Sequence, residues 1–211
     1  MAYFPFFVEL EGKECLVVGG GDVAFRKIRE LLSFGVNITV VSLEICESIC
    51  NLAGEYPGQM KLLYREYKKA DLEQKFFVIA ATDDEQCNRE ISKYCRQEKI
   101  LVNVVDDKEK CSFYFPSLVK QKDIVAGFSS GGNSPALIKE LRRELQGQIP
   151  EYFGELNERL GQIRPQVKKA FSTEQQRKQY YNQVIHKSRE ESRALSVQEM
   201  EELIHKGFTQ S

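Results

Sequence analysis

Three consecutive glycines, Gly19–Gly21, separate an apolar run from a segment of helical periodicity, and they constrain the fold more than any other feature. Continued to Ala24, the run reads G-x-G-x-x-A, the fingerprint of a dinucleotide-binding turn. We expect Gly19 at the tight turn, Gly21 where the backbone approaches a pyrophosphate, and Ala24 where the helix packs on the sheet. Larger side chains at these glycines would hold the ligand away.

The flanking residues support this interpretation. Cys15–Val18 is a short apolar run, typical of a strand buried on both faces. The helix that follows is expected to open at Asp22 and Val23, whose N–H groups would face the phosphates, and the helix dipole favours their negative charge. Gly35 is typical of a residue just beyond a helix end. Because glycine runs also make ordinary turns, this context is what favours dinucleotide binding.

The rest of the first half alternates apolar runs with helical segments. Strands are predicted at 37–41, 61–64, 76–81 and 100–105, and one helix is predicted at 43–53. Thr82–Glu85 has a capping-box pattern and predicts the start of another helix. Strands that alternate with helices predict an α/β fold with a Rossmann-like, doubly wound parallel sheet.

The pattern changes after about residue 107. Two runs at 112–119 and 124–129 predict a β-hairpin, and Ser134-Pro135 predicts the start of a helix. A hairpin with one helix is too small to be stable alone, so it either packs on the first domain or pairs with a second copy. The predicted parts are an NAD-binding domain at 1–111, a dimerisation region at 112–147 and a helical domain at 148–211.

Composition excludes several classes of protein. Thirty basic and 31 acidic residues leave a formal charge of -1, which argues against non-specific binding of nucleic acid. No apolar stretch approaches a membrane span, and the first residues lack the features of a signal peptide. The six cysteines form no C-x-x-C and have no histidine nearby, so we expect no metal site. Buried, reduced thiols suit a cytoplasmic protein.

Carboxylates are the candidates for proton transfer in the first domain, because both histidines, His186 and His205, lie in the helical tail. Asp106 and Asp107 directly follow the fifth predicted strand. The carboxyl ends of parallel strands border the ligand crevice, so an aspartate here is placed to meet a substrate beside the cofactor. A solvated loop or a helix cap explains the two residues equally well.

Residues after the second and fourth predicted strands bear on the cofactor. An NAD-binding unit usually has an acid about twenty residues beyond the glycines, for the ribose hydroxyls. Here Ser42 stands where the acid is common, and Glu44 follows slightly later, so Leu43 and Glu44 are the candidates for the ribose contact. No lysine or arginine there would accept a 2′-phosphate, which favours NAD over NADP. Thr82 and Asp83 are candidates for the nicotinamide side, although capping also explains them.

A second glycine-containing turn, 129–133, joins a predicted strand to a helix N-terminus. Its Ser130 and Gly131 are candidates for holding an anionic group. A plain turn followed by a helix cap accounts for the same residues.

Five motifs occur in a fixed order along the chain. They are Gly19–Ala24 followed by Arg26-Lys27, Ala80–Asp84, Asn103–Asp106, Ser112–Ser117, and Ser129–Gly132 followed by Ser134-Pro135. In this order they resemble the precorrin-2 dehydrogenases, a family that includes the N-terminal half of siroheme synthase. The resemblance spans most of the chain and is far more specific than the glycine run alone.

The resemblance implies an oxidoreductase that uses NAD to convert precorrin-2 to sirohydrochlorin, on the branch of tetrapyrrole biosynthesis that makes siroheme. It implies a homodimer and a helical C-terminal domain. It assigns the acid–base role to Asp106, places Asn103, Ser130 and Gly131 on the substrate side, and marks Ser130 as a phosphorylation site in some relatives. Some members also insert Fe²⁺ into sirohydrochlorin, so ferrochelatase activity stays open.

A different class of protein shares part of this pattern. Non-catalytic NAD-binding regulatory modules have the glycine turn and the parallel sheet, but they do not account for Asn103–Asp106 or for the hairpin with its glycine turn. The longer siroheme synthases continue into a methyltransferase where this sequence stops, so we do not expect it to methylate uroporphyrinogen.

Overall fold

The computed structural model describes residues 4–208, which form two compact units. The first unit is Phe4–Phe115, and the second begins at Pro116. The expected three-part division of the chain stays a prediction. None of the helices within the described residues is long and apolar enough to cross a membrane.

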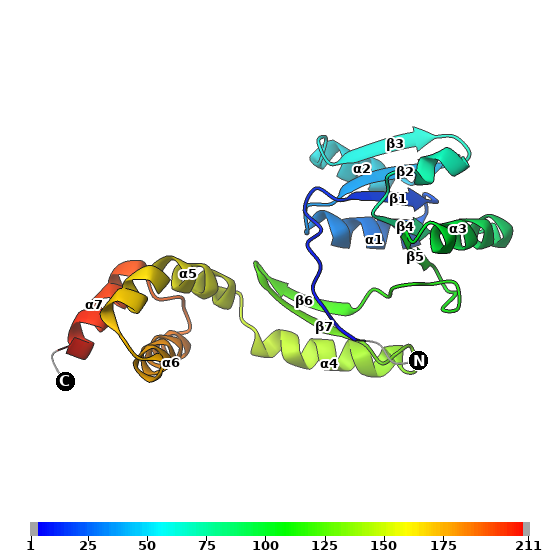
Figure 1. The fold of residues 1–211 in the computed structure, drawn as a ribbon. Coiled ribbons are helices and arrows are strands. Elements are labelled where there is room, and N and C mark those ends of the chain that lie inside the picture. The colour runs from blue at the N-terminus through cyan, green and yellow to red at the C-terminus, as the bar shows by residue number, and fades with distance from the viewer. Residues whose placement is uncertain (1–3, 209–211) are drawn as a thin grey trace. The chain divides into compact units, whose positions relative to one another are not determined.

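The first unit is built on a five-stranded sheet (Figure 1). Its strands are β1 (Glu14–Val18), β2 (Asn37–Ser42), β3 (Met60–Tyr64), β4 (Phe77–Ala80) and β5 (Leu101–Val104). They lie in the order β3-β2-β1-β4-β5, and every neighbouring pair is parallel. Its helices are α1 (Asp22–Leu32), α2 (Glu47–Glu55) and α3 (Glu85–Gln97), with a 3₁₀ turn, η1, at Lys69–Leu72. The Rossmann-like fold expected from the sequence is confirmed.

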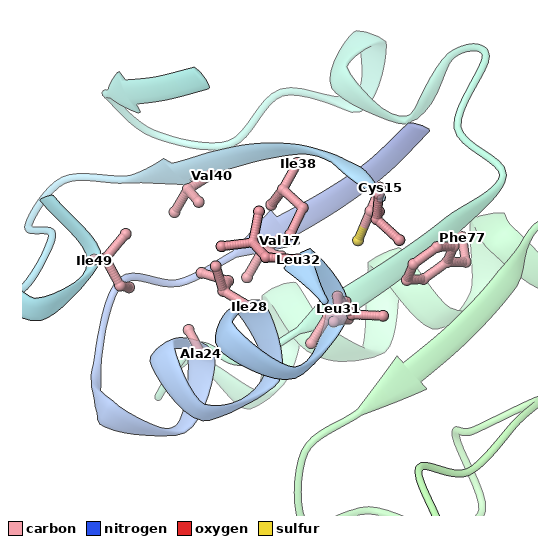
Figure 2. Close-up of a cluster of buried hydrophobic side chains, with 12 residues drawn as sticks. Cys15, Val17, Ala24, Ile28, Leu31, Leu32, Ile38, Val40, Ile49 and Phe77 are labelled. Atoms are coloured by element: carbon pink, nitrogen blue, oxygen red, sulfur yellow. The ribbon is translucent and has the colours of Figure 1, made fainter. Parts of the chain in front are cut away.

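Both faces of this sheet are buried. In β1, Cys15 and Val17 belong to one apolar cluster, while Leu16 and Val18 belong to another. Successive side chains of a strand point to opposite faces, so a continuous apolar run has to be covered on both sides. Figure 2 shows the first cluster, where Ile28 of α1 and Ile49 of α2 meet the strands. The residues of α3 belong to the second cluster.

The start of α3 differs from the expected capping box. Asp84, and not Thr82, is the N-cap, since its carboxylate accepts hydrogen bonds from the N–H groups of Gln86 and Cys87. An acceptor directly before a helix satisfies donors that have no partner in the first turn. Thr82 is thereby left for other contacts.

The second unit begins with an antiparallel hairpin of β6 (Ser117–Gln121) and β7 (Ile124–Phe128), followed by α4 (Pro135–Gln148). The first hairpin strand begins five residues later than the expected start at 112. The reason is that Ser112 pairs with the edge of β5: its N–H donates to the Val102 carbonyl, and its hydroxyl accepts from the Val102 N–H. The start of α4 is as expected, with Ser134 as the cap.

The remaining helices share a separate core. They are α5 (Tyr152–Ala170), α6 (Glu174–Glu190) and α7 (Val197–Phe208), and their apolar residues form one cluster. Helix α5 continues through Pro165. Thr173 caps α6 through a capping box with Gln176. The buried hydroxyl of Tyr180 donates to the Met200 carbonyl, which ties α6 to α7.

One buried serine in α6 should be dispensable. The Ser188 hydroxyl is inaccessible and has no hydrogen-bond partner, so folding costs it the hydrogen bonds it makes to water. We expect Ser188→Ala to raise the free energy of unfolding by about 0.5–1 kcal/mol, because alanine also favours the helix. Urea unfolding followed by circular dichroism measures this change.

Ser92 is the matched control, since it is also a buried serine in a helix but donates to the Lys110 carbonyl at 2.7 Å. Ser92→Ala should destabilise the protein by about 1 kcal/mol. Equal effects of the two substitutions would contradict the argument.

Candidate dinucleotide and substrate site

The candidate site lies where the strand order of the parallel sheet reverses. On one side of β1 lie β2 and then β3. On its other side lie β4 and then β5. Loops leaving the carboxyl ends of β1 and β4 therefore part, and the space between them is the usual ligand crevice of such sheets. A cavity of about 300 Å³ opens here. It is lined by Val23, Ala81, Thr82, Asp83, Glu85, Asn88, Val104, Val105, Asp106, Asp107 and Lys110.

The first two glycines are required by backbone packing. Gly19 has a φ of +113°, and a Cβ there would lie 2.2 Å from the Ala81 carbonyl oxygen. A Cβ on Gly20 would lie 2.2 Å from the Glu44 carbonyl oxygen. The turn after β1 is thus wedged between the loops that follow β4 and β2, and only glycine fits at these two positions.

Gly21 differs from its neighbours, because a Cβ built there meets nothing within 4 Å. It is the N-cap of α1 in an extended conformation, and because glycine has no side chain, it offers no capping acceptor to the first turn. Asp22 and Val23 are the first residues of α1, and the N–H groups and dipole at a helix start favour an anion. Binding of a pyrophosphate by Gly21, Asp22 and Val23 stays a prediction.

Thr82 is fixed by Asn88. The Thr82 hydroxyl donates to the Asn88 side-chain oxygen at 2.8 Å, and the Asn88 amide donates to the Thr82 carbonyl at 2.8 Å. This reciprocal pair holds the loop after β4 against α3. Asp83 is exposed at the cavity and makes no cap contact, because Asp84 caps the helix.

Leu43 and Glu44 are both exposed and follow β2. They do not line the cavity, and the backbone carbonyl of Glu44 packs against Gly20. Cys46 donates its N–H to the Gly20 carbonyl at 2.9 Å and closes the same loop. A role for Leu43 and Glu44 at the ribose stays a prediction.

Asp106 and Asp107 both line the cavity but have different surroundings. Asp106 is exposed in a turn just beyond β5, with a φ of +59°. The Asp107 carboxylate pairs with the ammonium group of Lys110 and accepts the Lys110 N–H, and the hydrogen bond from the Lys110 side chain holds the pKa of Asp107 below its usual range. The structure thus assigns Asp107 a loop-closing role.

Three residues of this site carried no recognised signal in the sequence: Asn88, Lys110 and Cys111. Asn88 and Lys110 reach the cavity from a helix and a loop. Cys111 lies behind the loop, within hydrogen-bond distance of the backbone of Val104 and Asp107. Asn88 is a polar residue on the buried face of α3, which it shares with Ile91, Ser92 and Cys95, and that position was the signal that could have revealed it.

Asn103 is only 7% exposed and does not line the cavity. Its amide donates to the Phe113 carbonyl at 3.1 Å and approaches the Cys111 sulfur at 3.5 Å. The side chain therefore ties β5 to the segment that covers its edge. Contact of Asn103 with a substrate stays a prediction.

Ser130 and Gly131 belong to the second unit, in the turn before α4. The Ser130 hydroxyl accepts the Ser134 N–H at 3.0 Å, and Gly131 has a φ of +61° and donates its N–H to the Ser129 hydroxyl. These contacts shape the turn. Its binding to a substrate stays a prediction.

The Cys111 thiol should lose its proton at a higher pH than an ordinary thiol. Burial raises its pKa, with a further contribution from the negative charge of Asp107. The native state therefore holds this proton more tightly than the unfolded state, so the stabilisation is full below the ordinary thiol pKa and is lost as the pH rises through the raised value.

We expect alkylation of native Cys111 by iodoacetamide to have its midpoint above the ordinary thiol range, as measured by peptide mass spectrometry over a pH series. The same peptide in denaturant provides the reference. A native midpoint at or below that reference would contradict the burial argument.

The fold and this site define a dinucleotide-binding protein with a Rossmann-like domain. The family model described as "Putative NAD(P)-binding" matches residues 6–117, and the chain belongs to this family. The matched residues cover the whole of the sheet and the cavity. Among the described residues, no group of three or more histidine, cysteine, aspartate or glutamate side chains could hold a metal ion.

Curated relatives extend the similarity beyond that domain. The chain is 38% identical over 188 residues to siroheme synthase of Pseudoalteromonas translucida, an alignment that covers 89% of this chain and 39% of the relative. It is 35% identical over 187 residues to siroheme synthase of Ruthia magnifica, with 88% and 39% covered. The chain thus spans about two fifths of the length of these relatives, and the resemblance to siroheme synthases is confirmed.

A solved structure described as "SirC, precorrin-2 dehydrogenase" has the same fold. It superposes with a TM-score of 0.72 at 23% sequence identity, and the match covers 98% of this chain and 100% of the other. At this identity the similarity is evidence for the fold alone.

Proposed function

We propose that this protein is a precorrin-2 dehydrogenase that uses NAD⁺ and produces sirohydrochlorin. The proposal is supported by the similarity to siroheme synthases over 188 residues and by the NAD(P)-binding family of its first unit. One observation carries it: the Asp106 carboxylate lines the same cavity as Val23 at the start of α1 and Thr82 beyond β4. A proton acceptor thus lies beside a dinucleotide cradle.

The protein's own residues divide the work of the reaction. Bound NAD⁺ supplies the acceptor for a hydride from a saturated ring carbon of the substrate. Gly21 and the first turn of α1 hold the pyrophosphate, and the Thr82–Asn88 pair keeps the loop after β4 in place. Asp106 takes the proton that the substrate loses together with the hydride, so the electrons and protons balance. Lys110, which also lines the cavity, is paired with Asp107 and keeps the loop beyond β5 closed.

The assay that tests this proposal mixes the purified protein with precorrin-2 and NAD⁺ in the absence of metal. We expect one NADH for each sirohydrochlorin, followed by absorbance, and a much smaller rate with NADP⁺. Binding of NAD⁺ without any binding or conversion of the tetrapyrrole would instead favour the non-catalytic NAD-binding regulatory module.

Fe²⁺ insertion belongs to the same proposal as a second step, with Fe²⁺ as substrate. Asp106 is a base that could take the pyrrole protons displaced by the metal. Adding Fe²⁺ to the sirohydrochlorin product tests it: an absorbance change to that of siroheme, faster than without protein, supports ferrochelatase activity. A rate equal to the protein-free rate overturns it.

We further propose a cytoplasmic homodimer. Helix α4 buries none of its residues within the single chain, and Leu137 on it is 56% exposed. A second copy covering this apolar side would remove it from water. Sedimentation equilibrium should give twice the chain mass, and Leu137→Asp should shift the species toward monomer. The six free thiols fit a reducing compartment.

A further inference from the structure

The segment Asp107–Phe113 replaces a sixth strand at the edge of β5. Ser112 exchanges hydrogen bonds with Val102, and the Lys110 carbonyl accepts from the Ser92 hydroxyl of α3. Arg96 of α3 donates to the carbonyls of Glu109 and Cys111. An unpaired strand edge exposes unsatisfied N–H and carbonyl groups, and this segment supplies partners for those of Val102 and Val104.

The Cys111 sulfur takes the place of a backbone partner at the end of β5. The Val104 N–H donates to the sulfur at 3.2 Å. The thiol lies 3.2 Å from the Val104 carbonyl oxygen and 3.1 Å from the Asp107 carbonyl oxygen, so its single proton has two alternative acceptors. The sulfur therefore contacts the backbone on both sides of the Val105-Asp106 turn.

The turn between these anchors is conformationally demanding. Asp106 has a φ of +59°, in the left-handed region that residues other than glycine adopt rarely. Asp106 is exposed and lines the cavity, and within residues 4–208 no hydrogen bond or ion pair of its side chain fixes the turn. The other closing contacts come from the backbone and from the Asp107–Lys110 pair.

We propose that Cys111 is a positioning residue, whose thiol holds the Val104–Asp107 turn and so directs the Asp106 carboxylate into the cavity. This inference rests on the proposed function for its catalytic consequence. Loss of the sulfur frees the turn, and Asp106 then spends less time in the position that accepts the proton.

Three variants test it: Cys111→Ala, Cys111→Ser as the conservative rescue, and Cys87→Ala as the matched control. Cys87 is also half-buried and packs against the same apolar cluster, but it belongs to α3 and not to the turn. Hydrogen exchange at the Val104 amide, read by NMR, reports the anchor without any activity. Steady-state kinetics with precorrin-2, which separates kcat from KM, reports its consequence.

For Cys111→Ala we expect exchange at Val104 to become at least tenfold faster and kcat to fall about tenfold. The KM values should change less than threefold, because positioning acts on the reaction step and not on binding. Cys111→Ser should recover most of both losses, since a hydroxyl keeps one donor and an acceptor. Cys87→Ala should match the wild type.

Unchanged exchange at Val104 in Cys111→Ala would overturn the anchoring role, and faster exchange with wild-type kcat would overturn positioning. If Cys87→Ala changes exchange at Val104 and kcat as much as Cys111→Ala does, both effects reflect general loosening of the domain, and this result would also overturn the proposal. If the wild type binds NAD⁺ but never converts precorrin-2, the proposed function fails, while faster exchange in Cys111→Ala alone would still support the anchor.

Discussion

Asp106→Asn should lower kcat for precorrin-2 about 10²–10⁴-fold while leaving NAD⁺ affinity unchanged, because the amide cannot accept the proton. Asparagine is the right replacement here. It has nearly the shape of aspartate, and both residues tolerate the left-handed backbone that Asp106 adopts at a φ of +59°. Loss of activity would therefore reflect the missing carboxylate and not a collapsed turn. Stopped-flow absorbance of NADH formation, with calorimetric titration of NAD⁺, measures both quantities.

Asp107→Asn is the matched control, since it makes the same change one residue further along. The Asp107 carboxylate is held by Lys110, so its loss should loosen the loop and lower kcat less than tenfold. A wild-type rate in Asp106→Asn with normal folding would show that another group accepts the proton. Equal losses in the two variants would point to the shape of the loop and not to acid–base chemistry.

Gly19→Ala should destabilise the protein by about 3 kcal/mol or more, or prevent folding altogether. The new Cβ would lie 2.2 Å from a backbone oxygen of Ala81, and the φ of +113° is unsuited to any L side chain. The obstacle is backbone, so it cannot rotate away as a side chain would. Urea unfolding followed by circular dichroism gives the change in free energy.

Gly21→Ala, two residues further on, should leave stability unchanged and weaken the binding of NAD⁺. Its backbone is extended, with a φ of -89°, and the Cβ meets nothing within 4 Å, so stability should stay within about 0.5 kcal/mol of wild type. Affinity for NAD⁺ should fall at least tenfold, because the methyl group enters the space assigned to the pyrophosphate. Wild-type affinity in a folded Gly21→Ala variant would place the phosphates elsewhere.

The sequence by itself determined the class of fold and the dinucleotide turn. The apolar run before Gly19 has the two-sided burial of a parallel strand, and the alternation of strands and helices leaves few other arrangements. These are local signals, carried by neighbouring residues, and the structure confirms the parallel sheet and the glycine turn between β1 and α1. Local patterns also placed Asp106 at the end of β5, but they did not separate it from Asp107.

Tertiary structure decided what each polar residue does. The two aspartates differ because Lys110 folds back onto one of them, and Asn103 is withdrawn from the cavity because its amide ties down Phe113. Asp84 caps α3 in place of the expected Thr82, and the Thr82 hydroxyl pairs with Asn88 instead.

Cys111 reaches Val104 because the segment that carries it lies along the edge of β5, where Ser112 pairs with Val102. Such contacts join residues that no periodicity relates, and their partners become known only when the chain closes on itself. Sequence periodicity records which face of an element is buried, whereas the pairing of individual polar groups depends on distances and directions that the folded chain alone fixes.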